Sequence, residues 1–123
     1  MELIFGGAYQ GKTQYAAKKY AFSELDIYTC DGLRLDPGAR CIRHLERFAK
    51  ACTEAGLDAR EEFDRQAPKA VCLIADDISC GIVPVDYLER TWREQAGRLL
   101  SHLAGQAETV TRIFCGLPLE LSR

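Results

Sequence analysis

Short apolar segments alternate with longer amphipathic segments along the chain, and the apolar segments end at glycine or aspartate. The segment 70–75 is apolar throughout, which is typical of a strand buried on both faces of a parallel sheet. With turn-forming residues as boundaries, the pattern predicts strands at residues 3–5, 25–30, 70–75 and 109–115. A short tail, Leu117-Pro118-Leu119, follows the last strand.

Helical periodicity fills the intervals between these strands. We expect helices over 12–21, over 39–66 with a break near Gly56, and over a long segment that ends near Gly105. A 4-3-4 spacing predicts one buried face of the second helix, formed by Cys41, Leu45, Phe48 and Cys52. An apolar stripe predicts the buried face of the long helix, formed by Leu88, Trp92, Ala96, Leu99 and Leu103.

Strands that alternate with helices predict an α/β fold. The expected architecture is a three-layer sandwich, in which a mostly parallel sheet of about four strands carries helices on both faces. The chain has 123 residues, which fits a single domain over 1–123.

Composition narrows the classes of partner. The chain is 47% hydrophobic and 28% charged, which is typical of a soluble globular protein, and its net charge of −2 gives no positive field to attract nucleic acid. No apolar run approaches the ~18 residues of a membrane span, and the first residues lack the pattern of a signal peptide. We therefore expect a cytoplasmic protein without a membrane or nucleic-acid partner.

The cysteines do not form a metal-binding or disulfide pattern. Six are present, and no two of them form a C-x-x-C pair. They are predicted to be reduced, mostly buried small hydrophobic residues: Cys30, Cys41, Cys52, Cys72, Cys80 and Cys115.

A glycine-rich loop follows the first predicted strand and matches the P-loop pattern G-x-x-x-x-G-K-[ST]. It consists of Gly6-Gly7-Ala8-Tyr9-Gln10-Gly11-Lys12-Thr13. Its glycines allow successive backbone N–H groups to surround an anion, and the following helix adds the positive end of its dipole. Lys12 is expected to reach the β- and γ-phosphates, and the hydroxyl of Thr13 is expected to ligate Mg²⁺. The alternative is a glycine turn that merely begins a helix.

A P-loop protein needs a further acidic group near its metal ion, usually at the end of a neighbouring strand. Asp76 and Asp77 end the strand 70–75, and Asp31 is a weaker candidate of the same kind. Either of the first two could instead cap the following turn. His44 and His102 lie in no pattern that identifies a nucleophile, so spacing alone favours surface positions on helices.

A second set of motifs carries a more specific resemblance. It comprises Asp77-Ile78-Ser79-Cys80-Gly81-Ile82-Val83-Pro84, then Leu88, Arg90, Trp92-Arg93 and Ala96-Gly97-Arg98, and the ending Cys115-Gly116-Leu117-Pro118-Leu119. With the P-loop, these motifs resemble the cobinamide kinase/cobinamide-phosphate guanylyltransferase family of cobalamin biosynthesis. In that family a strand leads into Asn-Glu-Val-Gly-x-Gly-Ile-Val-Pro, and a helix carries Arg, an aromatic residue, Arg and Ala-Gly-Arg. The likeness covers residues 1–20 and 70–121.

The resemblance implies a function. Members phosphorylate the hydroxyl of the aminopropanol arm of adenosylcobinamide and then attach GMP to that phosphate through a guanylylated histidine. It thus implies GTP or ATP with Mg²⁺, a corrinoid substrate, Lys12 as a catalytic residue, and a homo-oligomer. The family's histidine stands in an Arg-Ile-x-x-His pattern on the helix after the second strand, and Arg40-Cys41-Ile42-Arg43-His44 occupies the corresponding place. His44 is therefore the candidate for GMP attachment.

Departures from the family keep two alternatives open. The chain is shorter than members of the family, so one strand of the family's sheet is expected to be missing. Alternatively, the segment 25–30 corresponds to that additional strand. The histidine segment is then the missing part, and His44 has no role. Asp77 replaces Glu, Ser79 replaces Gly, and Leu100-Ser101 replaces Asn-Gln. The second functional hypothesis is therefore a P-loop protein that binds nucleotide without transfer and acts as a regulatory or assembly partner.

Overall fold

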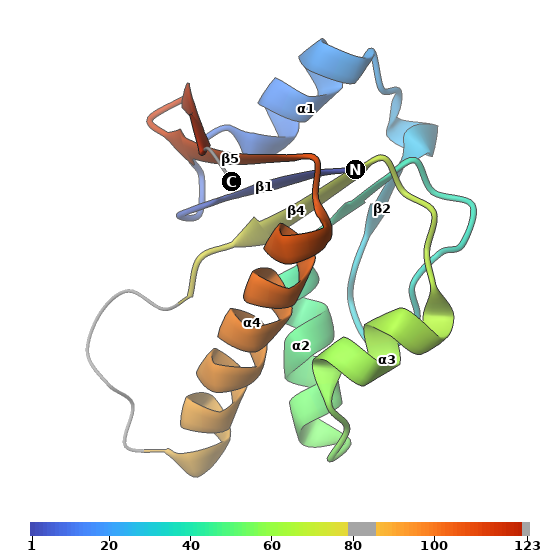
Figure 1. Ribbon diagram of the computed structural model, residues 1–123, viewed down its shortest axis with the longest axis vertical. Helices are drawn as coiled ribbons and strands as arrows, with labels where there is room; N and C mark the ends of the chain where they lie inside the picture. The colour runs from blue at the N-terminus through green and yellow to red at the C-terminus, as the bar shows by residue number, and fades with distance from the viewer. Residues whose placement is uncertain (79–85, 122–123) are drawn as a thin grey trace.

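A six-stranded sheet forms the centre of the computed structural model, which describes residues 1–78 and 86–121 (Figure 1). Its strands are β1 (Glu2–Gly6), β2 (Ile27–Thr29), β3 (Cys41–Arg43), β4 (Cys72–Asp76), β5 (Thr109–Phe114) and β6 (Leu117–Leu121). Their spatial order is β2-β3-β4-β1-β5-β6, and every neighbouring pair is parallel except β5 and β6. The carboxyl ends of β1, β3 and β4 therefore meet at one edge.

Helices cover both faces of this sheet. They are α1 (Lys12–Tyr20), α2 (Leu45–Glu54), α3 (Ala59–Gln66) and α4 (Tyr87–Gln106), with a 3₁₀ turn η1 (Glu24–Asp26) before β2. In Figure 1, α1 lies on one face and α2, α3 and α4 lie on the other. Within the described residues, no helix combines the length and the apolar character that a membrane span requires.

Strand alternation divides the buried side chains into two clusters. Leu3 and Ile4 are successive residues of β1, and Ile4 packs with Ala16 of α1 whereas Leu3 packs with the cluster that contains Phe48 and Leu99. The expected three-layer α/β fold with a mostly parallel sheet and helices on both faces is confirmed. The sheet has six strands, however, and not about four.

The first additional strand, β3, corrects the interpretation of segment 39–66. Cys41 belongs to this strand and pairs with both Ile27 of β2 and Cys72 of β4. It is buried on the α1 face, whereas Leu45 and Phe48 of α2 are buried on the opposite face. A spacing of four residues fits either structure locally, and pairing with two neighbouring strands favours the extended form.

The second additional strand, β6, replaces the predicted tail. It pairs with β5 through a turn at Cys115 and Gly116, both of which have positive φ. Pro118 is tolerated there because β6 is an edge strand.

The expected state of the cysteines is largely confirmed among the described residues: all are free and Cys115 alone is exposed. Cys80 lies outside the described residues.

A buried carboxylate links β1, α1 and β5 at the amino end of the sheet. Glu2 is 2% exposed and accepts hydrogen bonds from Thr111 Oγ1, from Tyr20 Oη at 2.5 Å and from Lys19 Nζ at 2.9 Å. Burial raises the pKa of Glu2, but these three donors together outweigh burial and hold the pKa below its ordinary value. The carboxylate is therefore a structural group that stays ionised.

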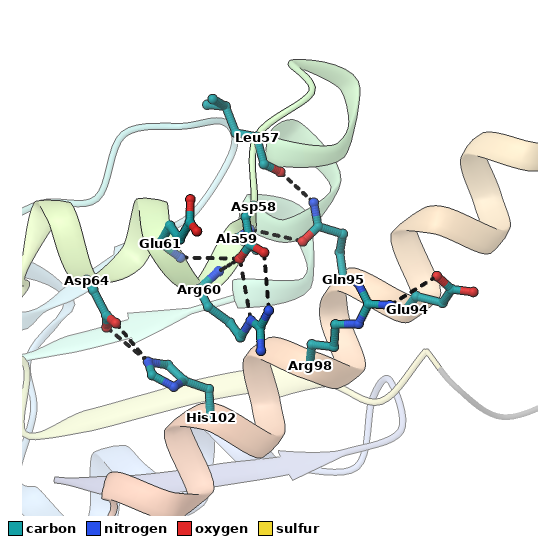
Figure 2. A network of polar contacts seen from close by, with 10 residues as sticks. All are labelled: Leu57, Asp58, Ala59, Arg60, Glu61, Asp64, Glu94, Gln95, Arg98 and His102. Atoms are coloured by element: carbon teal, nitrogen blue, oxygen red, sulfur yellow. Dashed lines mark hydrogen bonds and ion pairs between the residues drawn. The ribbon is translucent and has the colours of Figure 1, made fainter.

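Polar contacts join α3 to α4 at the surface (Figure 2). Asp58 caps α3 by accepting hydrogen bonds from the backbone N–H groups of its first turn. Gln95 of α4 accepts a hydrogen bond from Ala59 N at 3.0 Å. His102 Nε2 of α4 lies 3.0 Å from Asp64 of α3. His102 thus supports helix packing at the surface, which agrees with its expected position on a surface helix.

Candidate functional site

The glycine-rich loop connects β1 to α1 at the carboxyl edge of the sheet. Gly6 ends β1 so close to β5 that a Cβ atom would lie 2.4 Å from the carbonyl oxygen of Ile113. Gly11 precedes α1 with a φ of 91°, and no side chain caps the first turn. The first N–H groups of α1 are therefore left without side-chain partners, as an anion site at a helix N-terminus requires.

The turn between β5 and β6 supports this loop. Gln10 accepts a hydrogen bond on its backbone carbonyl from Gly116 N at 2.9 Å, and on its side chain from Cys115 N. The loop is thus fixed from two sides, by the close approach of Gly6 to β5 and by Gln10 on the turn. Sequence reasoning missed this support because it did not predict β6.

Lys12 is a buried cation in this loop. Its ammonium group donates to Gly7 O at 2.6 Å and lies 2.7 Å from Asp76 Oδ1, while the side chain is only 6% exposed. A buried ammonium is costly without a charged or polar partner, and both of its contacts come from the predicted site. The structure therefore brings the candidate lysine and one candidate aspartate together.

The two candidate aspartates take different positions. Asp76 ends β4, is paired with Gly6 in the register of the sheet, and lines the pocket above the loop. Asp77 donates its backbone N–H to Gly6 O at 2.7 Å. Of the two, Asp76 is the residue that the described structure places against the pocket. Asp31, the weaker candidate, is not among the pocket residues.

His44 lies at the same edge, although not on a helix. It precedes α2 directly after β3, with a left-handed φ of 61°. Its Nδ1 atom lies 2.8 Å from Glu46 Oε2 and 4.0 Å from Asp76 Oδ2. The predicted position of His44 on a helix is therefore wrong. The residue lies between β3 and α2, where its positive φ turns the chain from the strand into the helix. The corrected position nevertheless places His44 in the same pocket as the glycine-rich loop.

Glu46 is the site residue that sequence reasoning missed. It lies in the first turn of α2, is 7% exposed, and accepts a hydrogen bond on Oε1 from Asp76 N at 2.8 Å. Its backbone carbonyl accepts a hydrogen bond from Trp92 Nε1 of α4 at 2.7 Å. Trp92, predicted to anchor the core, is partly buried and connects α4 to the site. The sequence offers one signal of this role: a glutamate among the apolar residues on the buried side of α2.

Lys12, His44 and Asp76 line one pocket of about 250 Å³. Its lining residues are Ala8, Tyr9, Gln10, Gly11, Lys12, Thr13, Arg43, His44, Arg47, Ile74 and Asp76. Arg43 and Arg47 were not predicted, and Arg43 Nε donates to Thr29 Oγ1 at 2.7 Å. Three cationic side chains therefore surround a pocket above an uncapped helix N-terminus. This arrangement suits an anion with several negative oxygens.

The pocket also holds groups that suit a divalent cation. Thr13 and Asp76 both line it. Their side chains carry oxygen atoms, the ligands that Mg²⁺ prefers while it keeps several waters. A second grouping consists of His44, Glu46 and Asp76, whose ligand atoms lie within 4.8 Å of one another. Both groupings share Asp76, which Lys12 contacts in this structure.

Comparison with known proteins assigns the family. A family model described as cobinamide kinase / cobinamide phosphate guanyltransferase matches residues 39–121, which is more than half of the chain. The match includes His44, Glu46 and Asp76, whereas the glycine-rich loop precedes it. The motif segment Ser79-Cys80-Gly81-Ile82-Val83-Pro84 lies within the match but outside the described residues. A comparison with curated proteins found no match. With its mostly parallel α/β sheet and this match, the chain belongs to the cobinamide kinase / cobinamide phosphate guanyltransferase family.

Proposed function

We propose that this protein binds GTP or ATP with Mg²⁺ and transfers the γ-phosphoryl group to an alcohol, the hydroxyl of the aminopropanol arm of cobinamide. The observation that carries the proposal is the 2.7 Å contact between Lys12 and Asp76 inside the pocket. A phosphate-binding lysine at the start of α1 and a metal-binding carboxylate at the end of β4 are two charged groups that phosphoryl transfer uses.

The position of each pocket residue indicates its role in phosphate or metal binding. The first N–H groups of α1 and the Lys12 ammonium bind the β- and γ-phosphate oxygens, for which Lys12 exchanges its contacts to Gly7 O and Asp76. Thr13 and Asp76 hold the metal ion, which neutralises charge on the phosphates when bound. Arg43 and Arg47 offset further negative charge across the pocket. Asp77, a candidate metal ligand from the sequence, follows Asp76 directly in the chain and donates its backbone N–H to Gly6 O at 2.7 Å.

A second step is proposed at His44. The ring lines the pocket at the carboxyl end of β3, where it can reach the α-phosphate of a nucleotide whose β- and γ-phosphates lie on the loop. In this step GMP is attached to the histidine and then passes to the phosphate of the acceptor. The step accounts for the guanyltransferase activity in the description of the family.

The same proposal covers the remaining expectations. The chain acts as one domain over 1–123, in the cytoplasm and as a homo-oligomer. Its ligands are a nucleoside triphosphate and a corrinoid, and not nucleic acid. These points rest on composition and on the family.

The kinase step is tested with γ-labelled GTP and ATP and cobinamide as acceptor. We expect label in cobinamide phosphate with the unmodified protein, and its loss with Lys12→Ala. Lys18→Ala removes an exposed lysine from the same helix and is expected to retain the activity. Equal activity of Lys12→Ala and Lys18→Ala would contradict the proposal.

A second candidate function is nucleotide binding without transfer, in a regulatory or assembly role. The observation that favours it is the extent of the family match, which begins after the P-loop. Nucleotide binding that depends on Lys12, without label in cobinamide or on the protein, would support this candidate over the enzyme.

A further inference from the structure

We infer that Glu46 is a positioning residue that fixes the ring of His44, with the proton on Nδ1 and the lone pair of Nε2 presented to the nucleotide pocket. The inference rests on the proposed transfer of GMP through His44. It assigns a role to a buried glutamate that the kinase step does not use.

The hydrogen bonds of Glu46 define the arrangement. Its Oε1 accepts the backbone N–H of Asp76 at 2.8 Å, and its Oε2 lies 2.8 Å from His44 Nδ1. An ionised carboxylate can only accept hydrogen bonds, so the proton between Glu46 and the ring belongs to Nδ1. Within the described residues, no other side chain hydrogen-bonds to His44. The lone pair of the neutral ring is therefore on Nε2.

Glu46 itself has little freedom to move. The Asp76 N–H holds its carboxylate from β4, and Trp92 Nε1 of α4 holds its backbone carbonyl at 2.7 Å. His44 adopts a left-handed φ of 61°, a strained conformation for a residue other than glycine. Such a conformation persists where the surroundings fix it. The Glu46 contact, together with β3 and α2 on either side, provides that restraint.

The arrangement suits a nucleophilic histidine. The lone pair of His44 Nε2 attacks the α-phosphorus, a P–N bond forms, the bond from this phosphorus to the oxygen that bridges to the β-phosphate breaks, and pyrophosphate leaves. The ring keeps its Nδ1 proton and becomes cationic, and the Glu46 carboxylate offsets that charge. When an oxygen of the acceptor phosphate attacks, the P–N bond breaks and the ring returns to its neutral form. No proton has to move in either step.

A cation held by His44, Glu46 and Asp76 is the competing explanation of the cluster. It would require Glu46 to give up the contact with His44 Nδ1, although both carboxylate oxygens already have partners. The observations therefore favour the pairing of a carboxylate with a histidine, and metal binding becomes an outcome of the test.

Glu46→Gln provides that test because it keeps the size of the side chain and removes its charge. The amide can still accept from Asp76 N through its oxygen, but its NH₂ group would donate to His44 Nδ1 and move the ring proton to Nε2. We expect the acid-labile label that the protein takes from α-labelled GTP to form at least about 100-fold more slowly, by analogy with other carboxylate–histidine pairs. Nucleotide affinity should change less than about 3-fold. Glu54→Gln, an exposed glutamate on the same helix, is the matched control and should label normally.

A spectroscopic readout makes the test independent of turnover. Nitrogen-15 NMR of the histidine rings, with the His44 signals identified by their loss in His44→Gln, should show the Nδ1–H tautomer in the unmodified protein and the Nε2–H tautomer in Glu46→Gln. An Nε2–H ring in the unmodified protein, or normal labelling of Glu46→Gln, would overturn the inference. So would stoichiometric binding of Zn²⁺ or Mn²⁺ that is lost in Glu46→Gln.

The two proposals fail in different ways. If His44→Ala abolishes the label and Glu46→Gln does not, the role of Glu46 is wrong and GMP transfer stands. If the protein takes no label, or His44→Ala still takes it, the proposed GMP transfer is wrong, and the inferred role of Glu46 falls with it even if the tautomer is as expected.

Discussion

The Lys12 ammonium group lies 2.7 Å from the carboxylate of Asp76, at the point where β1 and β4 end side by side. In the sequence these residues are far apart, and each comes from a motif that is ambiguous alone. Their contact pairs the lysine of the glycine-rich loop with an acidic side chain.

Asp76→Asn is expected to separate metal dependence from phosphate binding. Because the variant frees Lys12 from its anionic partner, nucleotide affinity without Mg²⁺ should be unchanged or higher. The increase in turnover caused by Mg²⁺ should fall about 100-fold, in line with the loss of a group that stabilises charge in the transition state. Calorimetry with and without Mg²⁺, combined with the labelling assay, measures both. Asp77→Asn is the comparison. An equal effect of the two variants on Mg²⁺-dependent turnover would contradict the assignment of the metal ligand to Asp76 rather than to Asp77.

Gly6→Ala is expected to destabilise the fold. The added Cβ would meet the Ile113 carbonyl oxygen at 2.4 Å, and because both atoms belong to paired strands the backbone must shift. We expect the free energy of unfolding to fall by about 1–3 kcal/mol, the range for overpacked sites. Gly32→Ala, where no atom lies within 4 Å of the added Cβ, is the control in urea denaturation. Equal stability of the two variants would show that β1 and β5 are less close than described.

Glu2 is expected to make stability depend on pH in the acid range. Its pKa in the folded protein is lowered from 4.5, so the carboxylate stabilises the fold above about pH 4.5, and this contribution is lost as the pH falls through the folded pKa. Glu2→Gln should lower the free energy of unfolding by about 1–3 kcal/mol at pH 7. The difference from the unmodified protein should shrink below pH 4.5. Urea denaturation between pH 3 and pH 7 tests this, with exposed Glu24→Gln as control; a constant difference would refute it.

Gln10→Ala is expected to loosen the glycine-rich loop without unfolding the protein. The variant loses the bond from Cys115 N to the side chain and keeps the bond from Gly116 N to the backbone carbonyl. Nucleotide affinity should fall about 3- to 10-fold, the equivalent of one ordinary hydrogen bond, while thermal stability changes little. Unchanged affinity would mean that the β5–β6 turn does not support the loop.

Much of the fold follows from local pattern. The strand 70–75 is apolar throughout and ends in Asp76, and the glycine loop stands between a strand and a helix, so both halves of the pocket could be located in the sequence. Parallel strands bring their carboxyl ends together, which predicts that Lys12 and Asp76 are neighbours.

The remainder depends on partners that are distant in the sequence. β3 has three residues, too few for a periodicity, and its extended form is stabilised by pairing with β2 and β4. Glu46 is recognisable as a site residue only through Asp76 N and His44, and a helical pattern cannot show that a buried glutamate faces the end of another strand. The position of His44 depends on a positive φ, which is uncommon for residues other than glycine and which no local motif here predicts.

The central claim, that Lys12 and Asp76 form a working nucleotide site, is tested most directly by calorimetric titration with GTP and with ATP, each with Mg²⁺. The account predicts micromolar binding to the unmodified protein and to Lys18→Ala, and loss of binding in Lys12→Ala. It also predicts that the titrations with GTP and with ATP show which of the two bases is preferred. Absence of binding to the unmodified protein, or equal binding to Lys12→Ala, would contradict the account and leave the glycine-rich loop as a turn that begins a helix.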